Sequence, residues 1–331
     1  MKEGMVSTEK KRILQEINIP LLAKVHEWFK TPKRVSEKIV RMGMYVLIID
    51  LAFVFIFPFL FMLVTSLKTN TELYDITVNW VPKTLKFENY IIAFRALDYA
   101  IYSKNSLMIT IMATIGHLLS CSFIGYGLAR YQFPGKKILI FVVIIAMIVP
   151  VQTIIVPLYI VFANLKWLNT YLPVIVPTFF GYGLKGSLFL LVFRQFYLGL
   201  PKELENAAKI DGCGFIMTYW RIALPIARSA FLVTLLLSLV WHWNDFYEPA
   251  IYASKPSQIT LPARLNELVA MVNRPPEGLF DEMALADGES TVNNAVLMAG
   301  ICMVVMPVIA VFATLQKKFM QGIERTGLTG E

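Results

Sequence analysis

Three ionisable side chains, Asp50, His117 and Lys185, lie inside long apolar stretches of the sequence. A charge in an apolar interior is costly, so each of the three is a candidate for function. If the stretches are helices with a rise of about 1.5 Å per residue, the three side chains can share one layer. The structural interpretation is an Asp50–Lys185 pair, or single polar ties between helices. The functional interpretation is that Lys185 faces a path through the protein.

A second group of chemically useful residues closes another apolar stretch: Trp241, His242, Trp243, Asn244 and Asp245. Aromatic faces combined with a few polar groups suit the binding of a hydroxyl-rich ring. Tryptophans that anchor a membrane interface explain the same pattern equally well. Both interpretations remain open, and Trp241, Trp243, Asn244 and Asp245 join Lys185 as candidates for contact with a solute.

Familiar nucleotide and metal motifs are missing from the sequence. Residues 181–186 match G-x-G-x-x-G, but they lie in an apolar stretch without the strand-to-helix context of a dinucleotide site. No G-x-x-x-x-G-K-[ST] occurs, so energy from ATP would have to come from a partner. The three cysteines include no C-x-x-C pair and the three histidines are scattered, which argues against zinc. No cofactor or metal is therefore expected in this chain.

The elements that carry these residues are predicted to be membrane-spanning helices. Of 331 residues, 56% are hydrophobic and 16% are charged, which is more apolar than a soluble domain. A span needs about 20 mostly apolar residues. The predicted fold class is an all-α polytopic membrane protein, with a six-helix domain over residues 43–325. The six segments that qualify as spans are about 43–67, 105–129, 138–163, 172–194, 226–249 and 293–316.

Lys and Arg between the spans predict their orientation. The arm 1–42, the loops 130–137 and 195–225, and the residues after the last span are rich in these bases, whereas 250–292 is rich in acids. Both termini, including the tail 326–331, are therefore expected in the cytoplasm. The net charge of +8 then reflects orientation in a cell membrane rather than nucleic-acid binding. The basic arm is predicted to lie on membrane lipids or to pack on the protein's own cytoplasmic face.

The loop 195–225 is predicted to contain two short helices. Pro201 is a favourable first helical residue, and Glu203 suits the positive end of the helix dipole. Gly212 ends this first helix, which is predicted over about 203–211. A second helix, over about 215–222, then leads into the fifth span.

One face of the helix 203–211 is predicted to dock another protein. Leu204, Ala207, Ala208 and Asp211 lie on that face at helical spacing. The two alanines make the face flat enough for close approach by a partner.

Spacing within the same loop resembles the E-A-A loop of ABC importer permeases. That motif reads E-A-A, three residues, Gly, nine residues, and I-x-L-P. Asn206 departs from the usual Glu, and the neighbouring Glu205 is turned from that position by about 100° on a helix. The matching residues are Asn206, Ala207, Ala208, Gly212, Ile222, Leu224 and Pro225.

Other segments resemble the smaller permease of maltose-type carbohydrate importers. The likeness covers roughly residues 43–331. The segments include Glu88-Asn89-Tyr90, Gly125-Tyr126-Gly127-Leu128-Ala129-Arg130, Trp243-Asn244-Asp245-Phe246 and Leu315-Gln316-Lys317-Lys318-Phe319.

The resemblance implies a type I ABC importer permease that is not itself an enzyme and that forms half of a translocation path for a carbohydrate. The implied partners are a second homologous permease, an extracytoplasmic solute-binding protein, and two cytoplasmic ATPases that bind ATP and Mg. Residues 195–225 would be the coupling loop, whose helix enters a cleft on an ATPase. The alternatives are a permease for an acidic sugar, a glycerophosphodiester or an amino acid, and a stand-alone ion-coupled transporter. A solute carboxylate would suit Lys185 if that side chain faces the path.

Overall fold

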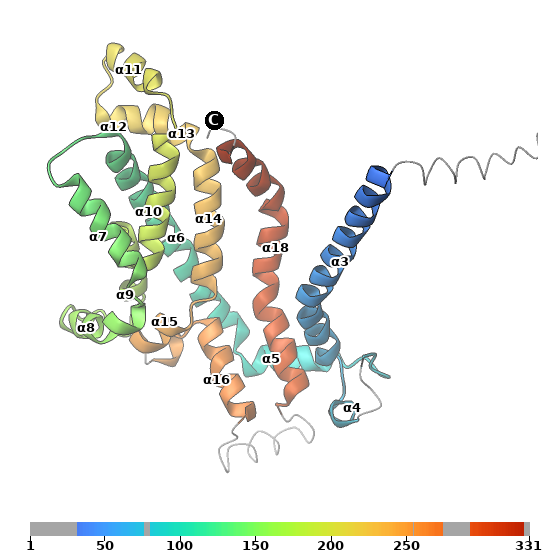
Figure 1. Ribbon diagram of the computed structural model, residues 1–331. Coiled ribbons are helices and arrows are strands. Elements are labelled where there is room, and N and C mark those ends of the chain that lie inside the picture. The colour runs from blue at the N-terminus through green and yellow to red at the C-terminus, as the bar shows by residue number, and fades with distance from the viewer. Residues whose placement is uncertain (1–31, 76–79, 254, 274–291, 328–331) are drawn as a thin grey trace, which may run out of the picture. The chain divides into compact units, whose positions relative to one another are not determined.

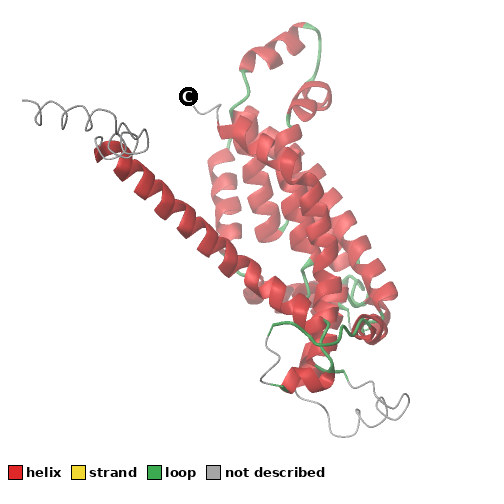
Figure 2. Cartoon of the chain, turned by 90° about the vertical axis from the view of Figure 1, so that its right-hand side faces the viewer, coloured by secondary structure: helices red, strands yellow, loops and turns green. Residues whose placement is uncertain are grey.

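The computed structural model describes residues 32–75, 80–253, 255–273 and 292–327, and the regular secondary structure within them is helical (Figure 2). The chain divides into two compact units, Met1–Phe61 and Met62–Glu331. Helix α3 (Pro32–Ser66) supplies the described part of the first unit, and its window of highest hydropathy contains no buried residue. Residues 1–31 of the predicted arm and residues 328–331 of the predicted tail lie outside the described residues.

Four helical stretches among the described residues are long and apolar enough to cross a membrane. They are Glu37–Ser66 of α3, Tyr99–Arg130 (α6), Leu172–Leu198, and Asn294–Lys317 of α18 (Asn294–Gly327). Two further pairs of helices qualify only as bent spans, which brings the number to six if each pair is one span. The all-helical polytopic fold that the sequence predicts is confirmed.

The segment predicted as the third span is sharply bent. Helices α7 (Lys136–Ile148) and α8 (Val151–Asn164) meet at 103°. Pro150 lies between them and has no N–H to donate, and it drives the preceding Val149 into an extended conformation with ψ 116°. Because of this bend, α8 runs in a different direction from α7.

The fourth and fifth predicted spans are also interrupted. The fourth consists of α9 (Leu172–Ile175), the 3₁₀ turn η1 (Val176–Phe180) and α10 (Gly183–Leu198). The fifth is α14 (Arg228–Trp243), which is bent by 76° from the stretch Phe215–Ile226 before it. Its helix ends six residues before the predicted boundary at 249, and Asn244 is its C-terminal cap.

Short helices lie at the two ends of the second unit. Helix α11 (Lys202–Ile210) and the C-terminal end of α18 lie at one end, whereas α15 (Tyr247–Tyr252) and α16 (Leu261–Asn273) lie at the other (Figure 1). The described parts of these segments therefore agree with the prediction that the loop 195–225 and the residues after the last span share one side, opposite to 255–273. Helices α4 (Asn70–Tyr74) and α5 (Glu88–Ala96) and the 3₁₀ turn η3 (Pro256–Gln258) complete the described elements outside the loop 195–225.

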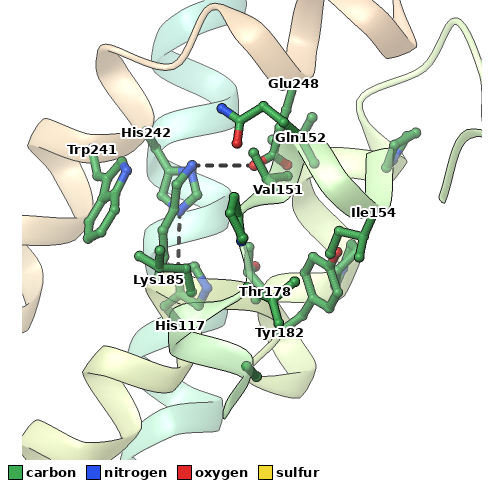
Figure 3. A pocket seen from close by; sticks show the side chains of 18 of the residues that line it. His117, Val151, Gln152, Ile154, Thr178, Tyr182, Lys185, Trp241, His242 and Glu248 are labelled. Atoms are coloured by element: carbon green, nitrogen blue, oxygen red, sulfur yellow. Dashed lines mark hydrogen bonds and ion pairs between the residues drawn. The ribbon is translucent and has the colours of Figure 1, made fainter. Parts of the chain in front are cut away.

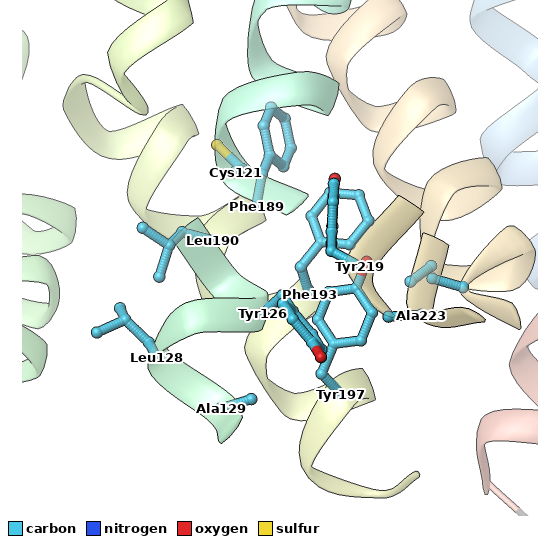
Figure 4. Packing of buried hydrophobic residues seen from close by; sticks show 12 residues of the cluster. Cys121, Tyr126, Leu128, Ala129, Phe189, Leu190, Phe193, Tyr197, Tyr219 and Ala223 are labelled. Atoms are coloured by element: carbon cyan, nitrogen blue, oxygen red, sulfur yellow. The ribbon is translucent and has the colours of Figure 1, made fainter. Parts of the chain in front are cut away.

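The core of the second unit forms around α6, which packs against α10, α14 and η1. An aromatic cluster joins α6 to α10 and to the end of the loop 195–225, and it includes Tyr126, Phe193, Tyr197 and Tyr219 (Figure 4). All four side chains are almost completely buried. Burial of such large rings dominates the energetics of a core.

Gly125 allows α6 to approach α10 closely, which leads to a stability prediction. A Cβ at this position would lie 2.8 Å from Cβ of Phe193 and 3.0 Å from the backbone N of Arg194. Gly125→Ala should therefore lower the stability of the purified protein by about 1–3 kcal/mol, the usual cost of overpacking. Gly127→Ala is the matched control, because nothing lies within 4 Å of its Cβ position. Thermal melts in detergent that show equal midpoints for the two variants would contradict this account of the helix crossing.

Candidate solute path and coupling loop

A cavity of about 570 Å³ opens in the second unit, between the bent pair α7–α8 and the helices α10 and α14 (Figure 3). Its wall from α7 and α9 is largely apolar. Its other side gathers polar and aromatic side chains from several elements. These are His117 from α6, Gln152 from α8, Thr178 from η1, Tyr182 and Lys185 near the start of α10, Trp241 and His242 from α14, and Glu248 from α15.

Lys185 is held by two acids at the edge of this cavity. Its Nζ lies 2.5 Å from Oδ2 of Asp245 and 3.8 Å from Oε1 of Glu248. The three side chains are only 14%, 9% and 20% exposed, respectively. Nζ also lies 5.9 Å from the centroid of the Trp241 ring, within range of a cation–π contact. Lys185 therefore lies between two acids at the cavity, and its contact with a solute stays a prediction.

Backbone breaks place these charges. Gly181 and Gly183 both have positive φ, 65° and 76°, a conformation that favours glycine. The break between η1 and α10 therefore puts Lys185 in the first turn of a new helix, beside the cavity. Asp245 lies just after the end of α14, where its Oδ1 accepts a hydrogen bond of 3.4 Å from the N–H of Glu248.

His117 ties α6 to α14. Its Nδ1 lies 3.1 Å from Nε2 of His242, and both rings are buried. One turn away, the hydroxyls of Thr114 and Ser238 are 3.0 Å apart. These contacts agree with the structural interpretation of His117 as a polar tie between helices.

The predicted partner of Lys185, Asp50, is exposed on α3 and belongs to the first unit. Because the structure gives Lys185 two other acids, an Asp50–Lys185 pair is not needed to neutralise it, and that pair stays a prediction.

Three of the five predicted path residues, Trp243, Asn244 and Asp245, are not part of the cavity lining, although Asp245 contacts Lys185. Trp243 is buried, and its Nε1 donates a hydrogen bond of 2.9 Å to the carbonyl of Val304 on α18. Asn244 donates to the carbonyl of Val240 at 2.9 Å and lies outside the lining. Successive helical residues point in directions about 100° apart, so neighbours of Trp241 need not share its surroundings. The assignment of Trp243 and Asn244 to the path stays a prediction. Sequence reasoning missed Glu248, although a second acid three residues after Asp245 was a usable signal.

The loop 195–225 has the predicted organisation. Helix α11 is capped by Asp211, and Gly212 has φ 80°, which confirms the glycine break. After the turn come α12 (Phe215–Thr218), the π-helical turn η2 (Tyr219–Ala223), which contains Ile222, and α13 (Leu224–Ile226), which contains Pro225.

The outward face of α11 differs from the predicted one. Ala208 is only 3% exposed, and its carbonyl accepts a hydrogen bond of 2.8 Å from the N–H of Cys213. It therefore cannot carry docking together with Ala207, as the spacing suggested, because the polypeptide after Gly212 folds back over it. The outward face instead carries Glu203, Leu204, Asn206, Ala207, Ile210 and Asp211.

The fold matches that of a transport protein of known structure. The crystal structure of a bacterial ABC transporter involved in the import of the acidic polysaccharide alginate contains a chain that superposes with a TM-score of 0.75. The match covers 88% of this chain and 99% of that one at 19% identity. This chain therefore has the fold of a membrane-spanning chain of that transporter, the type I ABC importer fold.

Sequence comparison identifies the family. Residues 121–325 match the model of the binding-protein-dependent transport system inner membrane component, and the chain belongs to that family. It is therefore a membrane component of a transport system rather than an enzyme. Because this family works with a binding protein, the alternative of a stand-alone ion-coupled transporter is wrong.

Similar proteins come from several organisms. The chain is 31% identical to the arabinooligosaccharides transport system permease protein AraQ of Bacillus subtilis over 88% of its own length and 96% of that protein. It is 31% identical to the probable starch degradation products transport system permease protein AmyC of Thermoanaerobacterium thermosulfurigenes, over 65% and 76% of the two chains. The sulfoquinovosyl glycerol transport system permease protein SmoH of Agrobacterium fabrum is 26% identical over 83% and 89%.

Proposed function

We propose that this chain is the permease subunit of an ATP-driven importer and forms half of the translocation path for an uncharged carbohydrate. The observation that carries the proposal is the Lys185–Asp245–Glu248 cluster beside Trp241, at the edge of a cavity bounded by broken helices. Interrupted helices at membrane depth are tolerated where they line a path. Carboxylates and an aromatic face offer acceptors and stacking to hydroxyl-rich rings.

The charge balance of the cavity favours an uncharged solute. The similar proteins include permeases named for neutral arabinooligosaccharides and for the anionic sulfoquinovosyl glycerol. Their names alone therefore do not distinguish an uncharged solute from a charged one. Lys185 faces two acids, so a solute carboxylate would meet Glu248 without a free base to balance it. The acidic-sugar alternative is therefore less favoured.

Coupling to ATP would run through α11. The helix projects from the end of the second unit and presents a face with a small residue, Ala207, next to the 86%-exposed Ile210 (Figure 1). Large exposed apolar side chains on such a face favour a protein partner. We infer that one of two cytoplasmic ATPases, which bind ATP and Mg, receives this helix in a cleft. A second homologous permease would complete the path, and an extracytoplasmic binding protein would deliver the solute.

Reconstitution tests the proposal. The chain, its second permease, its ATPase and its binding protein are placed in proteoliposomes, and uptake of labelled arabinotriose, maltotriose and trigalacturonate is measured with and without ATP. The expected result is ATP-dependent uptake of a neutral trisaccharide that requires all four components. Uptake by this chain alone, driven by an ion gradient, would contradict the proposal. ATP-dependent uptake of trigalacturonate alone would retain the importer and overturn the uncharged solute.

A further inference from the structure

The cytoplasmic end of α6 is held by the coupling loop through a buried ion pair. Nε of Arg130, the last residue of α6, lies 2.7 Å from Oε1 of Glu205 in the middle of α11. The two side chains are only 5% and 14% exposed. Nη2 of Arg130 also donates a hydrogen bond of 2.6 Å to the carbonyl of Leu200, just before α11. One guanidinium therefore holds both the approach to α11 and the helix itself.

Two further contacts join the same face of α6 to the segment that follows α11. The ring of Tyr126 stacks on Phe215 of α12 with centroids 5.5 Å apart. The hydroxyl of Tyr219 lies 3.0 Å from Oγ of Ser122. Ser122, Tyr126 and Arg130 are spaced by four residues, so they form one stripe on α6. The coupling loop is thus joined to α6 at α11, at α12 and at η2.

The other half of α6 forms part of the cavity wall. His117 lines the cavity and contacts His242 of α14. Arg130 and His117 are 13 residues apart, which corresponds to about 20 Å of continuous helix. Close packing against α10 and α14 makes α6 an element that transmits displacement rather than absorbing it.

The direction of Glu205 also shows that this residue does not take the place of the usual glutamate at position 206. Asn206 is exposed on α11, whereas Glu205 faces the body of the protein and is occupied by Arg130. The neutral Asn206 therefore stands on the outward face, and Glu205 is not available there to replace a glutamate.

We propose that the Arg130–Glu205 pair is the tie through which displacement of α11 moves α6 and, with it, the His117 side of the cavity. Both are positioning residues, and neither touches the solute. The inference rests on the proposed function, because it takes ATPase docking as the source of the displacement. An electrostatic tie between two mostly buried side chains is directional, whereas apolar packing alone would let α11 slide along the end of α6.

A labelling experiment can test the tie without a known solute. Gln152, which is exposed and lines the cavity, is replaced by cysteine in a Cys213→Ser background, leaving the buried Cys121 and Cys302. The chain is assembled with its second permease and ATPase in proteoliposomes. Reaction with a membrane-impermeant maleimide is then compared with and without ATP and vanadate. Glu205→Gln should reduce the nucleotide-dependent change in labelling by about tenfold, within the usual range of coupling between sites. Co-purified ATPase and ATP hydrolysis should stay within about twofold of the unsubstituted chain, because the outward face of α11 is intact.

The controls separate a tie from a folding defect. Lys209→Gln removes an exposed charge from the same helix but not from its outward face, so it should label like the unsubstituted chain. Glu205→Asp should restore part of the change. If Glu205→Gln does not assemble, the exchanged pair Arg130→Glu with Glu205→Arg is tested instead. A nucleotide-dependent change in labelling in that variant supports the tie, and an assembled complex without such a change overturns it. A full labelling change in Glu205→Gln, or parallel loss of ATPase binding and labelling, also overturns it. Absence of any nucleotide-dependent change in the unsubstituted complex would reject the proposed function and the tie together.

Discussion

Lys185→Met is expected to remove most uptake and to destabilise the second unit. The substitution keeps a long apolar side chain but leaves Asp245 and Glu248 as two mostly buried acids without their base. Breaking a buried pair in this way costs about 3–5 kcal/mol. We expect a lower melting temperature in detergent. We also expect uptake to fall at least in proportion to the fraction of the protein that no longer folds.

A second variant distinguishes loss of charge balance from loss of a solute contact. Lys185→Met combined with Asp245→Asn removes one base and one acid, so much of the lost stability should return. If stability returns while uptake remains low, Lys185 contacts the solute or orients Glu248 towards it. Lys104→Met, which removes an exposed lysine from the start of α6, is the control and should change neither property. Unaltered melting and uptake of both neutral and acidic sugars in Lys185→Met would refute the role given to this cluster.

Gly212→Val is expected to separate ATP hydrolysis from uptake. Gly212 has φ 80°, and a left-handed conformation costs a residue with a side chain about 1–2 kcal/mol, with β-branched valine among the poorest choices. The strain acts where the chain turns from α11 to α12, so it should change the angle of α11 on its ATPase. Hydrolysis should continue in the reconstituted complex while uptake per ATP hydrolysed falls.

Gly214 supplies a matched control for that experiment. It lies two residues later in the same turn, also with nothing within 4 Å of its Cβ position, but its φ is −74°. Gly214→Val therefore adds the same volume without the left-handed strain. Equal ratios of uptake to hydrolysis in the two valine variants would mean that backbone conformation at Gly212 is not what couples them.

Periodicity, apolar length and charge were enough to predict the helical membrane class and the two short helices of the coupling loop. These features are local: about 20 apolar residues make a span, and a glycine at a helix end makes a break. Boundaries were less predictable where proline acts. The segment 138–163 is apolar throughout, but Pro150 bends it by 103° into α7 and α8.

Side-chain partners depended on packing between distant segments. Lys185 has its acids at Asp245 and Glu248, about 60 residues along the chain, because the break at Gly181 and the end of α14 bring those turns together. Trp243 and Asn244 were grouped with Trp241 by sequence alone, yet only Trp241 lines the cavity. Neighbouring residues on a helix face different surroundings, and the packing of helices against one another sets which side chain faces the cavity.

The coupling loop shows the same division most clearly. The helix, the turn at Gly212 and the expected cytoplasmic side of the loop follow from its sequence, because backbone preference and charge act locally. The packing of the folded chain instead covers Ala208, leaves Ala207 outward and turns Glu205 inward to Arg130. Burial of a helix face depends on the surface against which it packs, here the end of α6 and the chain beyond Gly212.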